Sequence, residues 1–300
     1  MPKTIFADRG LSMALETTMA GAAENPTWVA ASRLGRLCIA VPAHTVWLQM
    51  RGCSRIVSSD GSFLLQRGEW IAFARDSRPE LQSDRGGLTL GLVLPAIGED
   101  PMPAYRYSFP LVGRGTLPRH ERNLAMRIWR HAAQRAPSET LAATRPFLLN
   151  LTHSQQELMM QFSRCPGRSF RRKSEAFEVL QRVKLYLDGN SHRLVRNVEL
   201  AAVSGYSAWY LSKIFNCVYE ASPQSIACQY RLERARHLLA HTFLGITEVS
   251  AACGFSNPAI FARAFRSGYG TTASKYRKSA HRMDRTTLLT TFDVQAGAHP

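Results

Sequence analysis

The sequence predicts an α+β protein with an antiparallel β domain followed by an all-α domain. Short apolar runs separated by turn dipeptides fill residues 28–112, which is typical of closely spaced strands. Residues 174–283 instead carry apolar side chains at helical spacing throughout. The length of 300 residues fits this division, because single domains commonly hold about 100–200 residues.

Changes in composition along the chain set the expected boundaries. Pro166-Gly167 ends a helical pattern, and the basic run that follows suits an exposed linker. We expect a partly disordered segment at 1–27, a β domain with C-terminal helices at 28–165, a linker at 166–173, a helical domain at 174–283 and a tail at 284–300.

The expected strands are short and bounded by turn residues. Asp60-Gly61 favours a hairpin, since glycine accepts the positive φ that a primed turn requires. Several such strands in succession indicate an antiparallel sandwich or barrel. The apolar runs are Leu37–Val41, Thr45–Met50, Ser62–Leu65, Trp70–Phe73 and Leu88–Leu94.

The charge of the chain is strongly positive and unevenly placed. There are 38 Lys and Arg residues against 22 Asp and Glu residues, which gives a net charge of +16. Residues 171–283 hold 17 basic and 7 acidic residues, so the excess is densest in the helical half. A phosphate-binding surface requires such an excess, although charge alone does not prove one.

Cysteine and apolar patterns exclude several classes of protein. The six cysteines show no CxxC spacing, so a disulfide framework or zinc site is not expected. We interpret Cys217 and Cys253 as small buried groups within helical packing. No apolar run reaches about 18 residues, and Asp8, Arg9 and Glu16 interrupt the N-terminus. A cytoplasmic protein without a membrane partner is therefore expected.

One pattern occurs twice in the helical half, at 197–215 and 246–265. Each copy has a short apolar helix, a Gly-aromatic-Ser turn and a second helix with a basic outer face. Gly205 and Gly254 permit the left-handed turn, and Ser207 and Ser256 are placed to cap the second helices. This is a helix-turn-helix written twice, and it predicts DNA recognition.

The second helix of the first copy divides into two faces at 100° per residue. The inward face holds Leu211, Ile214, Phe215 and Val218, and the outward face holds Trp209, Ser212, Lys213 and Asn216. An outward indole is unusual for a merely solvated surface. In a major groove it could contact a thymine methyl, while Lys213 and Ser212 could reach a base edge or a phosphate.

The second copy shows the same division. We assign Ile260, Phe261, Ala264 and Phe265 to the inner face, and Ala259, Ala262, Arg263 and Arg266 to the outer face. Arg263 is the best candidate for base recognition, because a guanidinium fork matches the O6/N7 edge of guanine. The two alanines let the backbone approach the bases, and Pro258 suits a first helical turn.

A helix from about 223 to 240 should separate the two copies. It would span roughly 26 Å, which suits two reading helices in successive major grooves about 34 Å apart. Arg231, Arg234 and Arg236 could touch phosphates or pair with Glu233, and the sequence leaves both alternatives open.

Motifs over residues 174–280 strongly resemble the AraC/XylS family of bacterial transcription regulators. They are Gly205-Tyr-Ser with Leu211-Ser-Lys-Ile-Phe, Arg231-Leu-Glu-Arg-Ala-Arg-His-Leu-Leu, Cys253-Gly-Phe-Ser with Phe261-Ala-Arg-Ala-Phe, Tyr269-Gly and Tyr276-Arg. The resemblance implies double-stranded DNA as partner, base contacts from Trp209, Ser212, Lys213 and the 257–263 region that begins at Asn257, and activation through contact with RNA polymerase.

The chain departs from the family pattern at three places. Glu220 stands where the family usually has the glycine that ends the first reading helix, which puts the local geometry in doubt. Ala273 replaces a common proline. Pro258 and Ala259 replace frequent polar residues, so the second copy is expected to make fewer base contacts.

The N-terminal strands more weakly resemble the cupin-like sensor domain attached to many such regulators. The similarity lies in residues 46–52 and 65–71. His44 has only Glu69 as a candidate partner and no His-x-His, so no metal and no cofactor are expected. The interior could hold a small-molecule effector or be plain core, and helices at 118–164 are the expected homodimer surface. The interior aromatics are Trp47, Phe63, Trp70 and Phe73.

Two other classes of protein were weighed against a DNA-binding regulator. An enzyme with a basic face lacks support, because no P-loop, Rossmann glycine pattern, nucleophile elbow or metal cluster is present. A non-specific architectural protein would bind all duplexes alike. The sequence therefore predicts a regulator, and not an enzyme.

Overall fold

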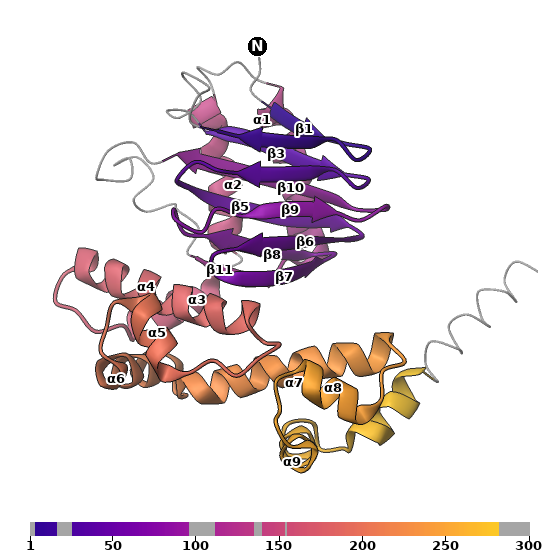
Figure 1. The fold of residues 1–300 in the computed structure, drawn as a ribbon. Coiled ribbons are helices and arrows are strands. Elements are labelled where there is room, and N and C mark those ends of the chain that lie inside the picture. Colours follow the sequence, from indigo (N-terminus) through magenta and orange to yellow (C-terminus); the bar gives the residue numbers. More distant parts are fainter. Residues whose placement is uncertain (1–3, 17–25, 96–111, 135–139, 154, 282–300) are drawn as a thin grey trace, which may run out of the picture.

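The computed structural model describes residues 4–16, 26–95, 112–134, 140–153 and 155–281. Strands form the N-terminal part and helices the rest, so the α+β prediction is confirmed (Figure 1). The strands are β1 (Thr4–Ala7), β2 (Ser12–Leu15), β3 (Thr27–Ser32), β4 (Arg36–Ile39), β5 (Ala43–Arg51), β6 (Cys53–Ser58), β7 (Gly61–Gln66), β8 (Glu69–Phe73), β9 (Glu80–Ser83), β10 (Leu88–Pro95) and β11 (Gly113–Thr116).

The described strands make two sheets that face each other. One has the order β1-β3-β10-β5-β8-β11 and the other β2-β4-β9-β6-β7. The sheets are not closed into a barrel, which is a detail in which the fold differs from the expected cupin-like form. Most pairs are antiparallel, but β1 pairs with β3 and β2 with β4 in parallel. Residues 4–15 thus belong to the sheets, although their weak patterning suggested disorder, because edge strands are only partly buried.

Apolar side chains fill the space between the sheets. Trp47, Phe63 and Phe73 are almost fully buried in one cluster there. Trp70 lies on the opposite face of its sheet and belongs to a second cluster. These four aromatics therefore pack as core, which favours the plainer of the two alternatives left open by the sequence.

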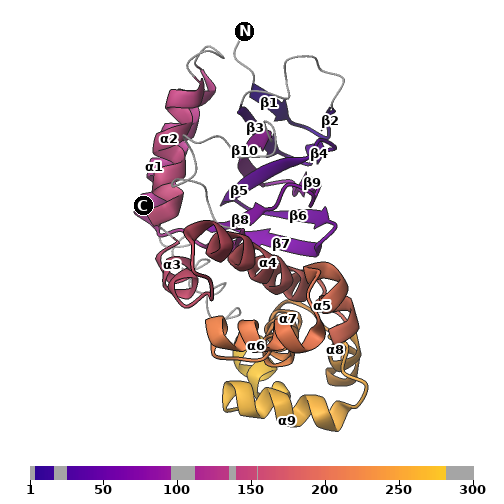
Figure 2. The same cartoon turned by 90° about the vertical axis from the view of Figure 1, so that its left-hand side faces the viewer.

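Helices cover the outer face of the six-stranded sheet (Figure 2). Trp28 on β3 meets the rings of Phe147 and Trp129 edge to face at 5.1 and 6.4 Å. Trp129 also donates a hydrogen bond to the carbonyl of Gly91. The helices of this layer are α1 (Arg119–Ala133) and α2 (Thr140–His153), and α3 (Gln156–Ser163) follows them and packs against the helices that come after it.

The remaining helices form the C-terminal part. The expected linker is shorter than 166–173, because Ser169 caps a helix that already begins at Phe170. No helix of the described residues is long and apolar enough to cross a membrane. The C-terminal helices are α4 (Phe170–Gly189), α5 (Asn197–Ser204), α6 (Ala208–Tyr219), α7 (Pro223–His241), α8 (Ile246–Ala252) and α9 (Pro258–Tyr269), with a further helical stretch at 273–281.

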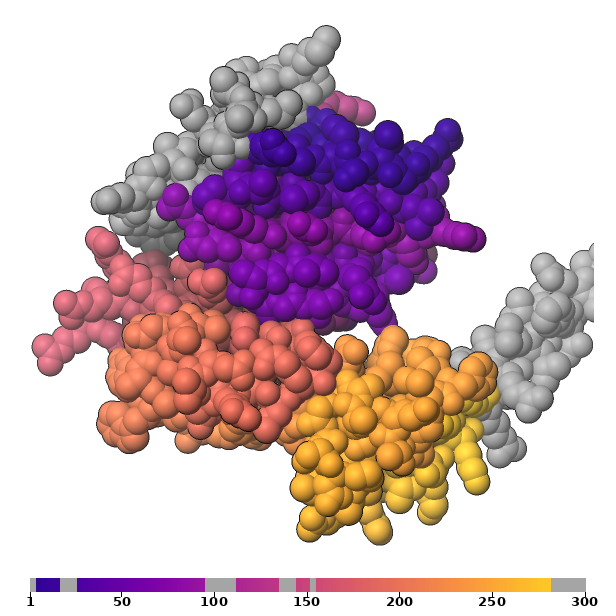
Figure 3. Space-filling view, in the orientation of Figure 1, coloured from indigo at the N-terminus to yellow at the C-terminus, as the bar shows by residue number. Residues whose placement is uncertain are grey.

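Helix α4 joins the strands to the C-terminal helices. The turn between β6 and β7 packs on its last residues so closely that a Cβ on Gly61 would meet the backbone of Gly189 at 2.5 Å. Arg182 pairs with the buried Asp60 at 3.1 Å, and the Asn190 amide donates to the Asp60 carbonyl. Figure 3 shows the resulting contact between the sheets and the helices below them. The sheets therefore hold α4 directly before the first helix-turn-helix.

Candidate nucleic-acid interface

The first helix-turn-helix consists of α5 and α6. Glu199 accepts a hydrogen bond from the backbone N–H of Arg196 at 2.9 Å and so caps the start of α5. Gly205 ends α5 in the left-handed conformation, with φ of 68°. The Ser207 hydroxyl accepts from the Tyr210 N–H at 3.3 Å and starts α6. Both turn residues thus do what the sequence predicts of them.

The two faces of α6 separate apolar from polar side chains. Trp209 is 72% exposed, and Lys213 and Asn216 are exposed beside it, while Ser212 is half-buried. The Lys213 ammonium lies 5.2 Å from the centre of the Trp209 ring, a cation–π contact that brings the two together. The buried face is Leu211, Ile214, Phe215 and Val218.

The second helix-turn-helix consists of α8 and α9 and has a different cap. Gly254 has a φ of 69°, as the turn requires. The cap of α9 is Asn257, whose side-chain oxygen accepts from the Ala259 N–H at 2.7 Å. Ser256 is exposed and does not cap the helix, so that prediction was wrong by one residue. The spacing to Pro258 explains the shift, because proline takes the first helical position and the cap directly precedes it.

The outward face of α9 is basic at one end. Arg263 and Arg266 are exposed, and neither guanidinium has a hydrogen bond or ion pair with the residues that the structure describes. The other exposed residues on this face have small side chains that project little from the helix backbone: Pro258, Ala259 and Ala262. A guanidinium group without a partner, surrounded by small side chains, is able to approach a base edge or a phosphate.

Ile260 lies on the outer side of α9 and not in the core. It is 47% exposed, whereas Phe261 and Phe265 are buried. At 100° per residue Ile260 stands about 120° from the mean direction of those two rings, which places it at the edge of the apolar stripe. The assignment of Ile260 to the inner face was therefore wrong, and centring the helical wheel on the two phenylalanines would have found it.

Helix α7 connects the two helix-turn-helices and has 19 residues, which is about 28 Å of helix. Two of its arginines bind the second unit. The Arg231 guanidinium lies 4.5 Å from the Phe255 ring and donates to the Gly254 carbonyl, and Arg234 donates to the Ala252 carbonyl. Arg236 hydrogen-bonds to two tyrosines at 269 and 276. These arginines have structural partners, which neither alternative from the sequence anticipated.

The turn of the second unit also touches the loop before the first. A Cβ on Gly254 would lie 2.6 Å from the Arg193 Cα, so this glycine allows a close approach of two backbones. Arg193 in turn pairs with Glu199 at 2.7 Å. In Figure 1 α6 and α9 are both seen nearly end on, on the side away from the sheets. Their axes are therefore roughly parallel, as two helices in successive grooves require.

The structure places two of the departures, Glu220 and Ala273, and the two cysteines predicted to be buried. Glu220 adopts the left-handed conformation without glycine, with φ of 55°, and pairs with Arg164 at 3.3 Å. Ala273 is buried in the core of the second unit. Cys217 is exposed, with its thiol against the Arg164 carbonyl, so its assignment to the interior was wrong, whereas Cys253 is buried.

His44 and Glu69, the one pair considered for a metal, lie at opposite ends of a strand ladder. Thr45 pairs with Phe73 and Leu48 with Trp70, so His44 and Glu69 are several residues apart along it. Burial lowers the pKa of His44 to about 4. No group of three or more potential metal ligands occurs in the described ranges.

The helical part matches known proteins over a limited stretch. A family model described as a helix-turn-helix domain matches residues 200–279. The Msm operon regulatory protein of Streptococcus mutans serotype c is 31% identical over 99 residues, which is 33% of this chain and 36% of that protein. The transcriptional activator NphR of a Rhodococcus species is 34% identical over 107 residues, 35% of this chain and 32% of that protein.

A solved structure matches the same part of the chain. The crystal structure of a probable AraC family transcriptional regulator from Rhodopseudomonas palustris is 31% identical, covers 34% of this chain and 96% of that one, and has a TM-score of 0.33. The chain spans about a third of the length of the two curated relatives described above. The matched residues contain the second half of α5 and all of α6, α7, α8 and α9. The C-terminal part of this chain is therefore a helix-turn-helix domain of the AraC type.

Proposed function

We propose that this protein is a sequence-specific DNA-binding transcription activator that reads two adjacent major-groove segments with α6 and α9. The observation that carries the proposal is the pair of outward faces on two roughly parallel helices, one with Trp209 and Lys213 and the other with Arg263 and Arg266. Activation is proposed because the similar NphR is named a transcriptional activator. No catalytic activity is assigned to the chain.

Exposure and charge support the roles of the outward side chains. An indole that is 72% exposed leaves apolar surface in water, and a thymine methyl or a sugar would cover it. Lys213 is held over that indole and would present its ammonium to a guanine or a phosphate. Arg263 lacks a partner in the described structure and would form the bidentate pair with guanine.

Some of the other outward residues would contact DNA, and others would let the helix backbone approach it. Ser212, Asn216 and Arg266 would donate to phosphates or base edges. Asn257 uses its oxygen to cap α9 and keeps its NH₂ group for DNA. Pro258, Ala259 and Ala262 would admit the backbone of α9 to the groove, and Ile260 would add an apolar contact beside them.

Selection of binding sites from random duplexes, at a fixed stated salt concentration, tests the proposal. The wild type should enrich two conserved half-sites about one helical turn apart. Arg263→Ala should lose the preference at one base pair, about 1–3 kcal/mol of discrimination. Arg130→Ala, which removes the same charge from exposed α1, should keep the motif. A selected pool without a common motif would sink the proposal.

We further propose that residues from about 171 to 283 form a separable DNA-binding domain and that the preceding residues sense a signal or dimerise. The expected result is that this fragment shifts the selected duplex by itself. If only the intact chain shifts it, dimerisation through the N-terminal part is required. Exposed leucines on α1 and α2, Leu124 and Leu149, are the proposed dimer contacts, and RNA polymerase is the proposed second partner.

A further inference from the structure

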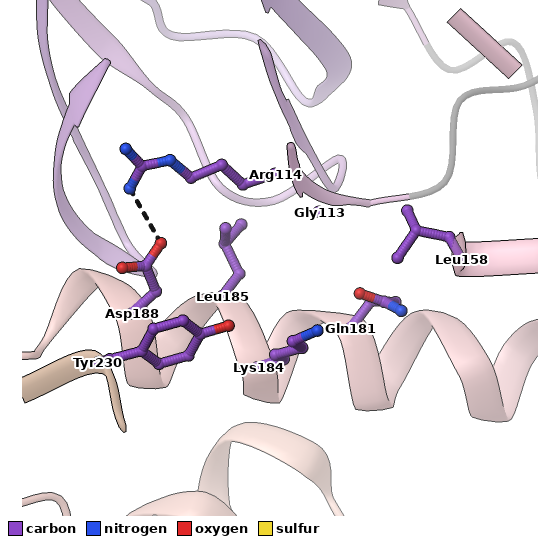
Figure 4. Close-up of a pocket in the computed structure, with 8 residues that line it drawn as sticks. All are labelled: Gly113, Arg114, Leu158, Gln181, Lys184, Leu185, Asp188 and Tyr230. Atoms are coloured by element: carbon purple, nitrogen blue, oxygen red, sulfur yellow. Dashed lines mark hydrogen bonds and ion pairs between the residues drawn. The ribbon is translucent and has the colours of Figure 1, made fainter. Parts of the chain in front are cut away.

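A small cavity lies where the edge of the six-stranded sheet meets α4 and the connecting helix α7. Its volume is about 50 Å³, and its walls come from β11, α3, α4 and α7 (Figure 4). A water molecule needs roughly 10–15 Å³ of such space, so several waters or a molecule of a few heavy atoms would fit. The lining residues are Gly113, Arg114, Leu158, Gln181, Lys184, Leu185, Asp188 and Tyr230.

One end of the cavity is closed by a satisfied ion network. Arg114 on β11 pairs with Glu69 at 2.9 Å and with Asp188 on α4 at 3.1 Å. Figure 4 draws the Arg114–Asp188 pair at the end of the cavity opposite Gln181 and Leu158. Because Arg114 already serves two carboxylates, it is a fixed wall that joins the sheet to α4, and not a group free for a ligand.

The other end presents hydrogen-bond donors without acceptors. Gln181 is only 2% exposed, and its amide nitrogen has no partner among the described residues. Lys184 lies one turn further along the same face of α4, as residues three apart do. Its ammonium makes no hydrogen bond or ion pair with the described residues, and it lies 5.2 Å from the centre of the Tyr219 ring.

The surroundings of Lys184 do not compensate its charge. Burial lowers the pKa of Lys184, and the carboxylates of Glu157, Asp188 and Glu233 only partly offset this effect from a distance. A half-buried ammonium and a buried amide without acceptors each cost free energy. An occupant that supplies acceptor oxygens at this end would remove both costs.

We propose that this cavity binds a small carboxylate of a few heavy atoms, whose oxygens accept from Lys184 and Gln181. The apolar tail of the ligand would lie against Leu158 and Leu185, which line the same space. In Figure 4 the Lys184 ammonium points toward Gln181, at the end of the cavity away from the Asp188 carboxylate, so a ligand held there would lie nearer to the ammonium than to that carboxylate. A sugar or nucleotide is too large for about 50 Å³.

The position of the cavity gives binding a consequence for DNA recognition, and this part rests on the proposed function. The ligand would touch α3, which precedes the helix-turn-helices, α4, which enters the first one, and β11 of the sheets. Tyr230 from α7, the helix that separates the two reading helices, completes the wall. Occupancy would therefore favour one relative placement of α6 and α9, and DNA affinity would change with it.

Thermal unfolding of the full chain without DNA tests the site. Acetate, propionate and inorganic phosphate are titrated against sodium chloride at equal ionic strength. The wild type should show a saturable rise in Tm with a carboxylate, by about 5 °C at 100 times Kd. Lys184→Met should lose this response, and Lys213→Met, on exposed α6, should keep it.

The other outcomes are equally decisive. Lack of a saturable response in the wild type, an equal response in Lys184→Met, or a response to phosphate alone would overturn the proposal. If Lys184→Met does not fold, Gln181→Leu replaces it and should weaken the carboxylate response at least fivefold. An unchanged response there would likewise overturn it.

A separate measurement tests the coupling to DNA. The affinity of the wild type for its selected duplex should change about fivefold or more when the carboxylate is saturating, and Lys184→Met should show no change. If the carboxylate does not change the affinity of the wild type for its duplex, the proposed coupling to DNA is wrong, while the carboxylate site itself is not contradicted. Failure to bind any duplex would remove the proposed function, while the unfolding data would still decide the site.

Discussion

The two helix-turn-helices have matching elements but different supports. In each, a glutamate at the third position of the first helix caps its own helix start, Glu199 in α5 and Glu248 in α8. The buried side of α6 belongs to a cluster that continues through α4 to Trp28 and Trp70 of the sheet. The buried side of α9 belongs to a cluster made only of α7 and the residues that follow it. The first unit is thus an extension of the N-terminal core, and the second is a small core of its own.

Because their supports differ, the two units should respond differently to a structural change in the N-terminal part. A unit joined to the sheets through α4 receives any change in the N-terminal part directly. The second unit is attached only through α7 and the Gly254–Arg193 contact, so a change in the N-terminal part reaches it indirectly. We expect the second unit to open locally at a lower free energy than the first, because fewer buried contacts hold it.

The largest expected effect is the loss of unfolding free energy when a buried phenylalanine at the equivalent position of either reading helix is replaced by alanine. Phe215→Ala and Phe265→Ala each remove a fully buried ring and should each cost about 3–5 kcal/mol. Hydrogen exchange should show Phe265→Ala losing protection in the C-terminal half of α7, in α8 and in α9, and not in α4. Phe215→Ala should lower protection in α4 as well. Equal loss across the strands in both variants would contradict the separate-core description.

The turn glycines should respond unequally to alanine. Both have a left-handed φ, but a Cβ at 205 would meet nothing within 4 Å, whereas one at 254 would meet the Arg193 backbone. Gly205→Ala should therefore cost about 1–2 kcal/mol from the backbone alone. Gly254→Ala should cost about 1–3 kcal/mol more from crowding. Chemical unfolding of both variants measures the gap, and equal losses would mean that the two units do not press together.

The residues that end α6 and α9 can be exchanged between the two helices as a test. Both helices end in a left-handed residue, Glu220 in one and Gly270 in the other. Glu220→Gly should stabilise the protein by up to about 1 kcal/mol, less whatever the exposed pair with Arg164 contributes. Gly270→Glu should destabilise it by about 1 kcal/mol. Midpoints of urea unfolding that move in the same direction for both would refute this account.

The smallest effect is a pH dependence of the first unit. The hydrogen bond from the Arg196 backbone, together with the Arg193 side chain, lowers the pKa of Glu199 below its usual 4.5. Because the folded pKa is the lower one, the stabilisation is complete above pH 4.5 and is lost as the pH falls through the folded value. Glu199→Gln should flatten that part of the acid-unfolding profile slightly. A profile identical to the wild type would remove this role.

The local features of the helical half could be predicted from residue types alone. A glycine that must turn left-handed, a serine before a helix and apolar residues at helical spacing each act within a few residues. For that reason Gly205, Ser207 and the buried face of α6 were correctly assigned. Errors arose where a neighbour one position away offered a better choice, as Asn257 did for Ser256 beside Pro258.

Tertiary structure decided everything that depends on which surfaces meet. The arginines of α7 have the chemistry of phosphate contacts, yet the second unit supplies carbonyls and rings that bind them. Nothing near Gly254 in the sequence shows that Arg193 lies against it, and nothing near Lys184 shows that Asp188 on the same helix pairs with Arg114. Local spacing fixes the direction of a side chain along its own helix, but its partner comes from a segment whose position only the packed chain determines.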